Sequence, residues 1–154
     1  MENSIESKES GSIDYAGLVR QAFAAREGAY APYSNFLVGA ALLTAAGPVY
    51  SGCNIENAAF TPTNCAERTA FFKGISEGHR RFRAMAVVGG QREKGPADFD
   101  YVFPCGVCRQ IMAEFCGGDF EIIVAKSPQD YKVFLFSEIF PQAFGPGDLK
   151  GDPA

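Results

Sequence analysis

Two short cysteine motifs constrain this chain more than any other feature of its sequence. They are Cys65-Ala66-Glu67 and Pro104-Cys105-Gly106-Val107-Cys108. Together they offer three thiolates, one fewer than the four ligands that close a tetrahedral structural zinc site. A metal with three protein ligands keeps one position open for water. The motifs therefore predict an open metal site rather than one that only holds the fold together.

The residues around the cysteines indicate how such a site would work. Three thiolates give bound Zn²⁺ a net negative charge, which makes a bound water less acidic. Both motifs are expected to begin helices, whose N-termini carry partial positive charge. Arg68 and Arg109 follow the motifs directly and are expected to donate hydrogen bonds to the thiolates. These positive groups offset the negative charge of the thiolates, so zinc is expected to acidify its bound water. Hydrolysis is therefore the expected chemistry, and Glu67 is the expected proton carrier.

Other interpretations of the cysteines stay open at this point. A Cys-x-x-Cys pair alone is also typical of redox sites, although that function leaves the first motif unexplained. Cys53 or Cys116 would make a closed four-cysteine site if either supplied a fourth ligand. Glu67 would have a purely structural role if it formed a capping box with Thr63 or Asn64.

Length, charge and cysteine content narrow the classes of protein to consider. A chain of 154 residues, 47% hydrophobic, is long enough to bury one core. The net charge of −4 argues against a nucleic-acid or anionic-membrane partner, which usually requires a basic patch. Five cysteines without an apolar signal segment favour the cytoplasm. No apolar run in the sequence approaches membrane-spanning length.

The pattern of apolar residues and chain breakers predicts alternating helices and strands. We expect helices over 14–30, 65–77 and 105–115, strands over 37–43, 49–55, 84–88, 120–125 and 131–136, and a short helical turn within 137–144. Asp14 is the expected cap of the first helix, and Gly117-Gly118 the expected end of the third. This order predicts a mixed sheet covered by helices. Residues 1–12 are polar and expected to be disordered, which leaves 13–154 as a single domain.

Five motifs follow one another in order between about residue 14 and residue 148. They are Ala31-Pro32-Tyr33-Ser34-Asn35-Phe36, Val38-Gly39-Ala40-Ala41, Gly52-Cys53-Asn54-Ile55-Glu56-Asn57-Ala58, Asn64-Cys65-Ala66-Glu67-Arg68-Thr69-Ala70 and Pro104-Cys105-Gly106-Val107-Cys108-Arg109-Gln110. Together they resemble the small homotetrameric type of cytidine deaminase. Zinc deaminases carry a His or Cys, a Glu two residues later and a Pro-Cys-x-x-Cys further on.

The resemblance implies a fold, an activity and an assembly. It implies a three-layer α/β/α sandwich with a five-stranded mixed sheet. It implies hydrolytic deamination of cytidine and deoxycytidine to uridine and deoxyuridine, with release of ammonia, in pyrimidine salvage. The expected protein is cytoplasmic and homotetrameric, with one zinc ion per subunit and active sites completed across subunits.

The resemblance also assigns roles to individual residues of the metal site. Cys65, Cys105 and Cys108 are expected to hold zinc. Glu67 is expected to take a proton from the zinc-bound water, which then attacks C4 of cytosine, and to pass that proton to N3.

Further residues are assigned to the substrate in the same way. Asn54 and Glu56 match a pair that binds the ribose hydroxyls, and their i, i+2 spacing places both on one face of a strand. Phe36 is expected to pack against the pyrimidine ring, and the backbone around Ala66 to contact its amide edge. Phe144 matches an aromatic residue that reaches a neighbouring subunit's site. Phe60 stands where the family often has Tyr.

Three alternative functions remain at the level of sequence. Blasticidin-type aminonucleoside deaminases share the cysteine motifs, although the run from Asn54 to Ala58 favours an ordinary nucleoside sugar. Nucleic-acid-editing deaminases share the zinc chemistry, and the acidic balance of this chain argues against them. A structural zinc module that binds a partner protein is the alternative from a different class.

Overall fold

In the computed structural model, which describes residues 11–149, helices and strands follow one another in the predicted order. They are α1 (Tyr15–Arg26), β1 (Phe36–Thr44), β2 (Val49–Cys53), α2 (Ala66–Ser76), β3 (Phe82–Gln91), a 3-10 turn (Pro96–Asp98), α3 (Gly106–Phe115), β4 (Glu121–Ser127), β5 (Asp130–Leu135), α4 (Phe136–Ile139) and a second 3-10 turn (Pro146–Leu149). The disorder predicted for the N-terminus falls almost wholly on residues 1–10, outside the described residues. Within residues 11–149, no helix combines the length and apolar character needed to cross a bilayer.

The strands form one five-stranded mixed sheet in the order β2-β1-β3-β4-β5. Only β3 and β4 run parallel, and every other neighbouring pair is antiparallel. The antiparallel pairs β1–β2 and β4–β5 are hairpins, whereas the parallel pair needs the crossover that α3 provides. The predicted mixed sheet of five strands is therefore confirmed.

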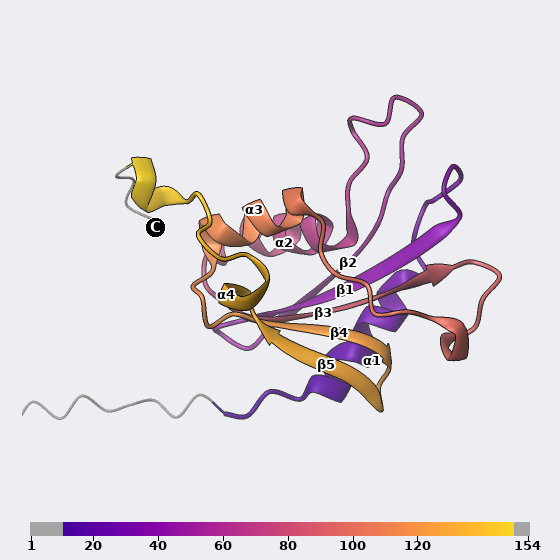
Figure 1. Ribbon diagram of the computed structural model, residues 1–154, viewed down its shortest axis with the longest axis horizontal. Helices are drawn as coiled ribbons and strands as arrows, with labels where there is room; N and C mark the ends of the chain where they lie inside the picture. Colours follow the sequence, from indigo (N-terminus) through magenta and orange to yellow (C-terminus); the bar gives the residue numbers. More distant parts are fainter. Residues whose placement is uncertain (1–10, 150–154) are drawn as a thin grey trace, which may run out of the picture.

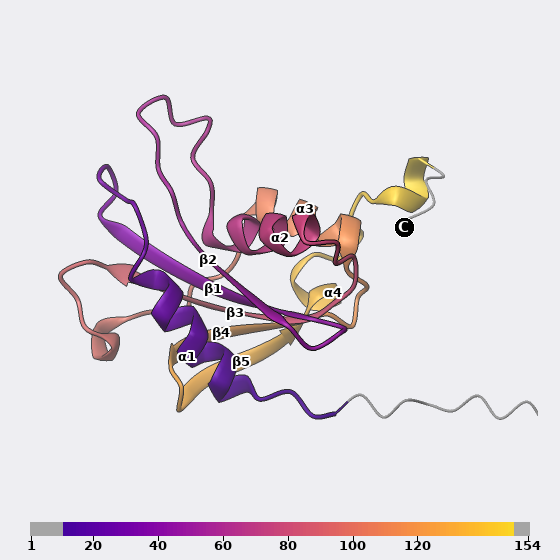
Figure 2. The same ribbon diagram turned by 180° about the vertical axis from the view of Figure 1, so that it is seen from behind.

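Helices cover both faces of this sheet (Figures 1 and 2). On one face α1 crosses the strands, and Leu18, Val19 and Ala22 of the helix are buried in the core there. On the other face α2 and α3 lie side by side over a larger core that contains Phe71, Met112 and neighbouring residues of β1, β3 and β4. The predicted three-layer α/β/α arrangement is therefore confirmed.

Several predicted element ends differ from the structure: the first helix ends at Arg26 rather than near Tyr30, and β2 ends at Cys53, so Asn54 and Glu56 lie beyond the strand rather than on one face of it. Asp14 caps α1 as expected, accepting a hydrogen bond of 2.9 Å from the Gly17 N–H. However, β3 continues through Gly89 and Gly90, because these glycines admit close packing: a Cβ on Gly90 would lie 2.3 Å from the Phe99 ring. Helix α3 ends in extended backbone at Cys116 rather than in a left-handed glycine.

The buried side chain of Arg26 holds the end of the sheet next to the motif that runs from Ala31 to Phe36. Arg26, at the end of α1, donates to the Leu37 carbonyl at 3.0 Å and to the Gly90 carbonyl at 2.9 Å. Its guanidinium also lies 4.7 Å from the centre of the Phe99 ring. Burial lowers the pKa of Arg26, and the carbonyls of Leu37, Gly90 and Gln91 accept its hydrogen bonds. This arrangement aligns the start of β1 with the end of β3.

Gly52 in β2 allows the N-terminal turn of α2 to lie directly on the sheet. A Cβ at this position would lie 2.5 Å from both the Ala66 carbonyl oxygen and the Ala70 nitrogen. Because Ala66 opens the helix that follows Cys65, this contact sets where the first cysteine motif lies relative to the sheet.

We expect Gly52→Ala to lower the free energy of unfolding by about 1–3 kcal/mol, because the methyl group overpacks a helix–sheet contact. Urea unfolding measures this change. Gly95→Ala is the matched control, since a Cβ at Gly95 meets nothing within 4 Å. Equal stability of the two variants would contradict the close approach of α2.

Candidate active site

Three sulfur atoms meet where the N-termini of α2 and α3 converge. Cys65 is the N-cap of α2, Cys105 is the N-cap of α3, and Cys108 lies in the first turn of α3. The Cys65 and Cys105 sulfurs are 3.7 Å apart, and those of Cys105 and Cys108 are 3.5 Å apart. All three lie within 4.8 Å of one another. Zn–S bonds of about 2.3 Å in a tetrahedron require sulfurs roughly 3.8 Å apart, so the cluster fits zinc.

The surroundings of the cluster favour a thiolate at Cys65, whereas the hydrogen bond with Cys65 and burial raise the pKa of Cys108. The Arg68 guanidinium donates from Nη2 to the Cys65 sulfur at 3.3 Å. Hydrogen bonding from the Cys108 thiol, and then from Arg68 and Cys105, lowers the pKa of Cys65 to about 5 despite its burial. Within residues 11–149, Arg68 Nε is buried without a hydrogen-bond partner, so this arginine has a further donor at the cluster. Helix N-termini add partial positive charge on two sides.

Glu67 lies beside the cluster in the first turn of α2. Only 3% of the residue is exposed, and its Oε2 accepts a hydrogen bond of 3.0 Å from the Cys108 thiol. Burial raises the pKa of Glu67 to about 7. A carboxyl group whose pKa lies near neutrality suits a group that takes up and releases a proton. Neither Thr63 nor Asn64 is the N-cap of α2, so Glu67 does not belong to the capping box considered above.

A cavity of about 250 Å³ opens beside the sulfur cluster, and Cys65, Glu67 and Cys105 line it. Its lining comes from β1, the chain after β2, the start of α2 and the chain before α3: Val38, Asn54, Glu56, Thr63, Asn64, Cys65, Ala66, Glu67, Val102, Phe103 and Cys105. The loops before β1 and after β2 project from the same end of the sheet (Figure 1). The fold thus brings Asn54, Glu56 and Ala66 into one cavity with the cysteine cluster.

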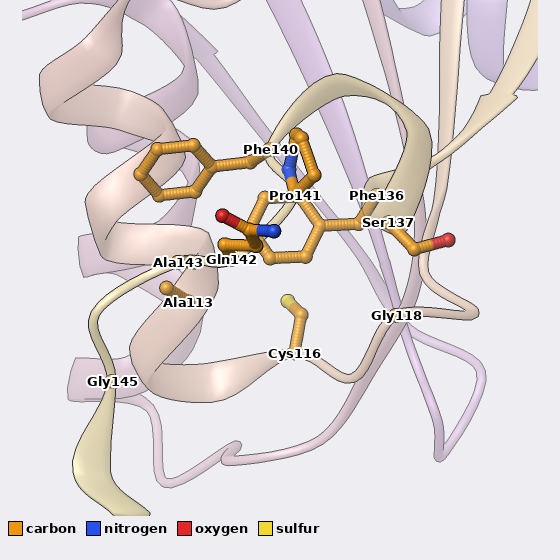
Figure 3. Close-up of a pocket in the computed structure, with 10 residues that line it drawn as sticks. All are labelled: Ala113, Cys116, Gly118, Phe136, Ser137, Phe140, Pro141, Gln142, Ala143 and Gly145. Carbon is orange, nitrogen blue, oxygen red and sulfur yellow. The ribbon is translucent and has the colours of Figure 1, made fainter. Parts of the chain in front are cut away.

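A larger hollow of about 420 Å³ lies between α3 and the segment 136–145 (Figure 3). Phe136, Phe140 and Pro141 surround it, and the Cys116 side chain points into it. The described residues that line it include no carboxylate, histidine or lysine, and burial raises the pKa of the Cys116 thiol. Neither Cys116 nor Cys53 belongs to the sulfur cluster, so the four-cysteine alternative has no structural support.

Asn54 and Glu56 already have partners within the chain. The Asn54 amide donates to the Phe36 carbonyl and accepts from the Val38 N–H, both at 2.8 Å. One N–H and one lone pair of that amide remain for a ligand. Glu56 accepts hydrogen bonds from the loop before β1, and the Ser34 hydroxyl is the main cause that lowers its pKa. Glu56 is therefore an ionised acceptor at the cavity wall.

The three aromatic residues assigned to the substrate do not line this cavity. Phe36 packs over Gly89, where a Cβ would lie 3.0 Å from its ring. Phe60 is 70% exposed and meets the Tyr33 ring edge to face at 5.9 Å. Phe144 is 58% exposed, and its carbonyl accepts a hydrogen bond of 2.9 Å from the Gln110 side chain.

The hydrogen bonds of Arg109 differ from the expectation. Its Nε donates to the Pro104 carbonyl at 2.8 Å, and its Nη1 donates to the Ile139 carbonyl. Among the hydrogen bonds of residues 11–149, none joins Arg109 to a sulfur. The guanidinium therefore contacts backbone oxygens at the turn before Cys105 and at the end of α4. Arg109 thus connects the second cysteine motif to the C-terminal segment.

Two lining residues escaped the sequence reasoning. Val102 and Phe103 precede Pro104 and form a wall of the cavity. Phe103 is 41% exposed and packs against Phe134 of β5 with ring centres 5.3 Å apart. In the sequence, only their position directly before the second cysteine motif could have indicated that they line the site.

Comparisons with known proteins agree on one family. Residues 14–124 match the model of the cytidine and deoxycytidylate deaminase zinc-binding region. A cytidine deaminase from Sporosarcina psychrophila is 47% identical over 137 residues, which are 89% of this chain and 96% of the relative. One from Halalkalibacterium halodurans is 47% identical over 89% of this chain and 98% of its own. The crystal structure of cytidine deaminase from Burkholderia pseudomallei is similar with a TM-score of 0.74 and 45% identity, over 83% of this chain and 97% of that one.

Proposed function

We propose that this chain, which belongs to the zinc-dependent cytidine deaminase family, hydrolyses cytidine and deoxycytidine to uridine and deoxyuridine and releases ammonia. The observation that carries the proposal is the position of Glu67. A buried carboxyl group touches a three-sulfur cluster that fits zinc, at the base of a cavity. This combination supplies a metal, a proton carrier and room for a small substrate.

Each residue of the site has a separate role in the proposed reaction. Cys65, Cys105 and Cys108 would hold the zinc ion, which would lower the pKa of a bound water that adds to C4 of the base. Glu67 would accept a proton from the water at its carboxylate, deliver it to N3 of the pyrimidine, and then protonate the amino group, which leaves C4 as ammonia. The backbone around Ala66 contacts the amide edge of the base, while Asn54 and Glu56 hold the sugar hydroxyls. Arg68 withdraws electron density from the Cys65 thiolate.

The lining of the cavity favours a free nucleoside over a nucleotide. Among the described residues that form it, none is Lys, Arg or His, and Glu56 is ionised at its wall. A phosphate on the sugar would therefore meet negative charge without a counter-ion. We expect the monophosphate of cytidine to be a poor substrate.

We also propose an assembly and a location. Phe144 and Phe60 are exposed and absent from the cavity of their own chain, which supports a homotetramer in which they complete the site of another copy. Phe36 supports the pyrimidine from behind the cavity wall, and Arg109 holds the turn that carries Cys105. Residues 13–154 act as one domain. All five cysteines are free, which suits the cytoplasm and a role in pyrimidine salvage.

Steady-state kinetics on cytidine, deoxycytidine, cytidine monophosphate and blasticidin S, with a zinc assay on the same sample, test this function. We expect turnover of both nucleosides and a kcat/KM for the monophosphate about 10²-fold lower, since like charges cost several kcal/mol. Preferred turnover of blasticidin S would identify an aminonucleoside deaminase instead. Bound zinc without deamination of any of these compounds would identify a structural zinc module.

A further inference from the structure

The loop before β1 surrounds one carboxylate of the cavity with hydrogen-bond donors. The N–H groups of Tyr33 and Ser34 donate to Glu56 Oε1 at 2.9 and 3.1 Å. The Ser34 hydroxyl donates to the other oxygen, Oε2. Both carboxylate oxygens are therefore held from the side of the loop: Oε1 accepts two hydrogen bonds and Oε2 accepts one, which leaves one lone pair on Oε2 for a ligand.

The Ser34 hydroxyl connects two parts of the site. It donates its only proton to Glu56 and accepts a hydrogen bond of 3.1 Å from the Phe36 N–H. The Phe36 carbonyl in turn accepts the Asn54 amide at 2.8 Å. A continuous set of hydrogen bonds thus runs from Glu56 through Ser34 and the backbone of Phe36 to Asn54.

The loop itself is braced from outside the cavity. Asn35 adopts a left-handed conformation with φ of 59°, which Asn tolerates better than most residues. Its N–H donates to the Ala31 carbonyl at 3.0 Å, and its own carbonyl accepts the Arg92 N–H at 2.9 Å. Arg92 Nε also donates to the Asn35 side chain at 2.8 Å. Ser34 is therefore presented from a fixed backbone.

We propose that Ser34 is a positioning residue that orients the Glu56 carboxylate toward the sugar and so sets how strongly the enzyme depends on the sugar hydroxyls. This inference rests on the proposed function, in which Glu56 binds those hydroxyls. A carboxylate tied at both oxygens needs to lose little rotational freedom when substrate binds. Without the hydroxyl, the carboxylate is held through Oε1 alone, so Oε2 is free to rotate away from its productive orientation.

Comparing cytidine with 2′,3′-dideoxycytidine tests this role, because the second compound lacks the 2′ and 3′ hydroxyls of the sugar. We expect Ser34→Ala to lower kcat/KM for cytidine about tenfold, mainly through KM, and to leave kcat/KM for dideoxycytidine unchanged. Ser34→Thr keeps the hydroxyl and is expected to restore most of the loss. Ser76→Ala, at the far end of α2, is the matched control because its hydroxyl bonds only to the Lys73 carbonyl among the described residues.

A double variant guards against a general loss of folding. In a Glu56→Ala background, Ser34→Ala is expected to have no further effect on cytidine turnover, because the two residues act through one interaction. An equal loss on both substrates, or an additive loss in the double variant, would overturn the role of Ser34 alone. Equal use of both substrates by the unaltered enzyme would overturn the role of Glu56 and Ser34 together. Absence of any deamination would overturn the proposed function.

Discussion

Glu67→Gln is expected to lower kcat for cytidine by about 10²–10⁴-fold, the usual contribution of a positioned proton carrier. The amide keeps the size of the side chain but cannot shuttle a proton between water and the base nitrogen. Because Glu67 is not one of the three clustered ligands, the variant is expected to keep its zinc. The loss of cytidine absorbance and a metal assay on the same sample measure the two effects.

Glu77→Gln is the matched control for this experiment, since Glu77 is exposed at the other end of the same helix. Its turnover is expected to equal that of the unaltered protein. Near-normal turnover in Glu67→Gln would contradict the assignment of Glu67 as the proton carrier. Loss of zinc in that variant would instead indicate that Glu67 helps to hold the metal.

Cys108→Ala is expected to lose zinc, turnover and stability together. Cys108 is fully buried among Cys105, Cys65 and Glu67, so its removal leaves two sulfurs and a cavity where the metal binds. Binding of structural zinc contributes roughly 10–16 kcal/mol in small zinc-dependent peptides, so loss of one ligand has a large effect on stability. Zinc content per chain and the melting temperature are the measurements.

Cys53→Ala controls for removing a thiol as such. Cys53 ends β2 outside the sulfur cluster, and its variant is expected to keep one zinc per chain. A stable, fully metallated Cys108→Ala protein would exclude Cys108 as a ligand. Loss of zinc in Cys53→Ala would revive the four-cysteine site.

The sequence predicted the parts of this molecule that depend on local patterns. The chain breakers before Cys65 and Pro104 before Cys105 placed both cysteines at helix starts, and the structure makes each the N-cap of its helix. Alternating apolar segments predicted the order of strands and helices that the mixed sheet shows. These features were accessible because motif spacing and periodicity act over a few residues.

Features that depend on contacts between distant segments were not accessible in this way. Arg109 follows a cysteine directly, yet its partner Ile139 is 30 residues away. Ser34 reaches Glu56 across 22 residues, and Phe103 gains its place in the cavity wall by packing on β5. Charge next to a motif predicted a role for Arg109 at the sulfurs, and tertiary hydrogen bonds to backbone oxygens decided otherwise.

The dependence of turnover on zinc tests the central claim most directly. Protein stripped of metal by a chelator is titrated with zinc while cytidine deamination and bound zinc are measured on the same samples. Turnover is expected to rise in proportion to bound zinc and to saturate at one ion per chain, the number that the single three-sulfur cluster of residues 11–149 accommodates. Full turnover in the metal-free protein, or saturation with zinc without any deamination, would contradict the account.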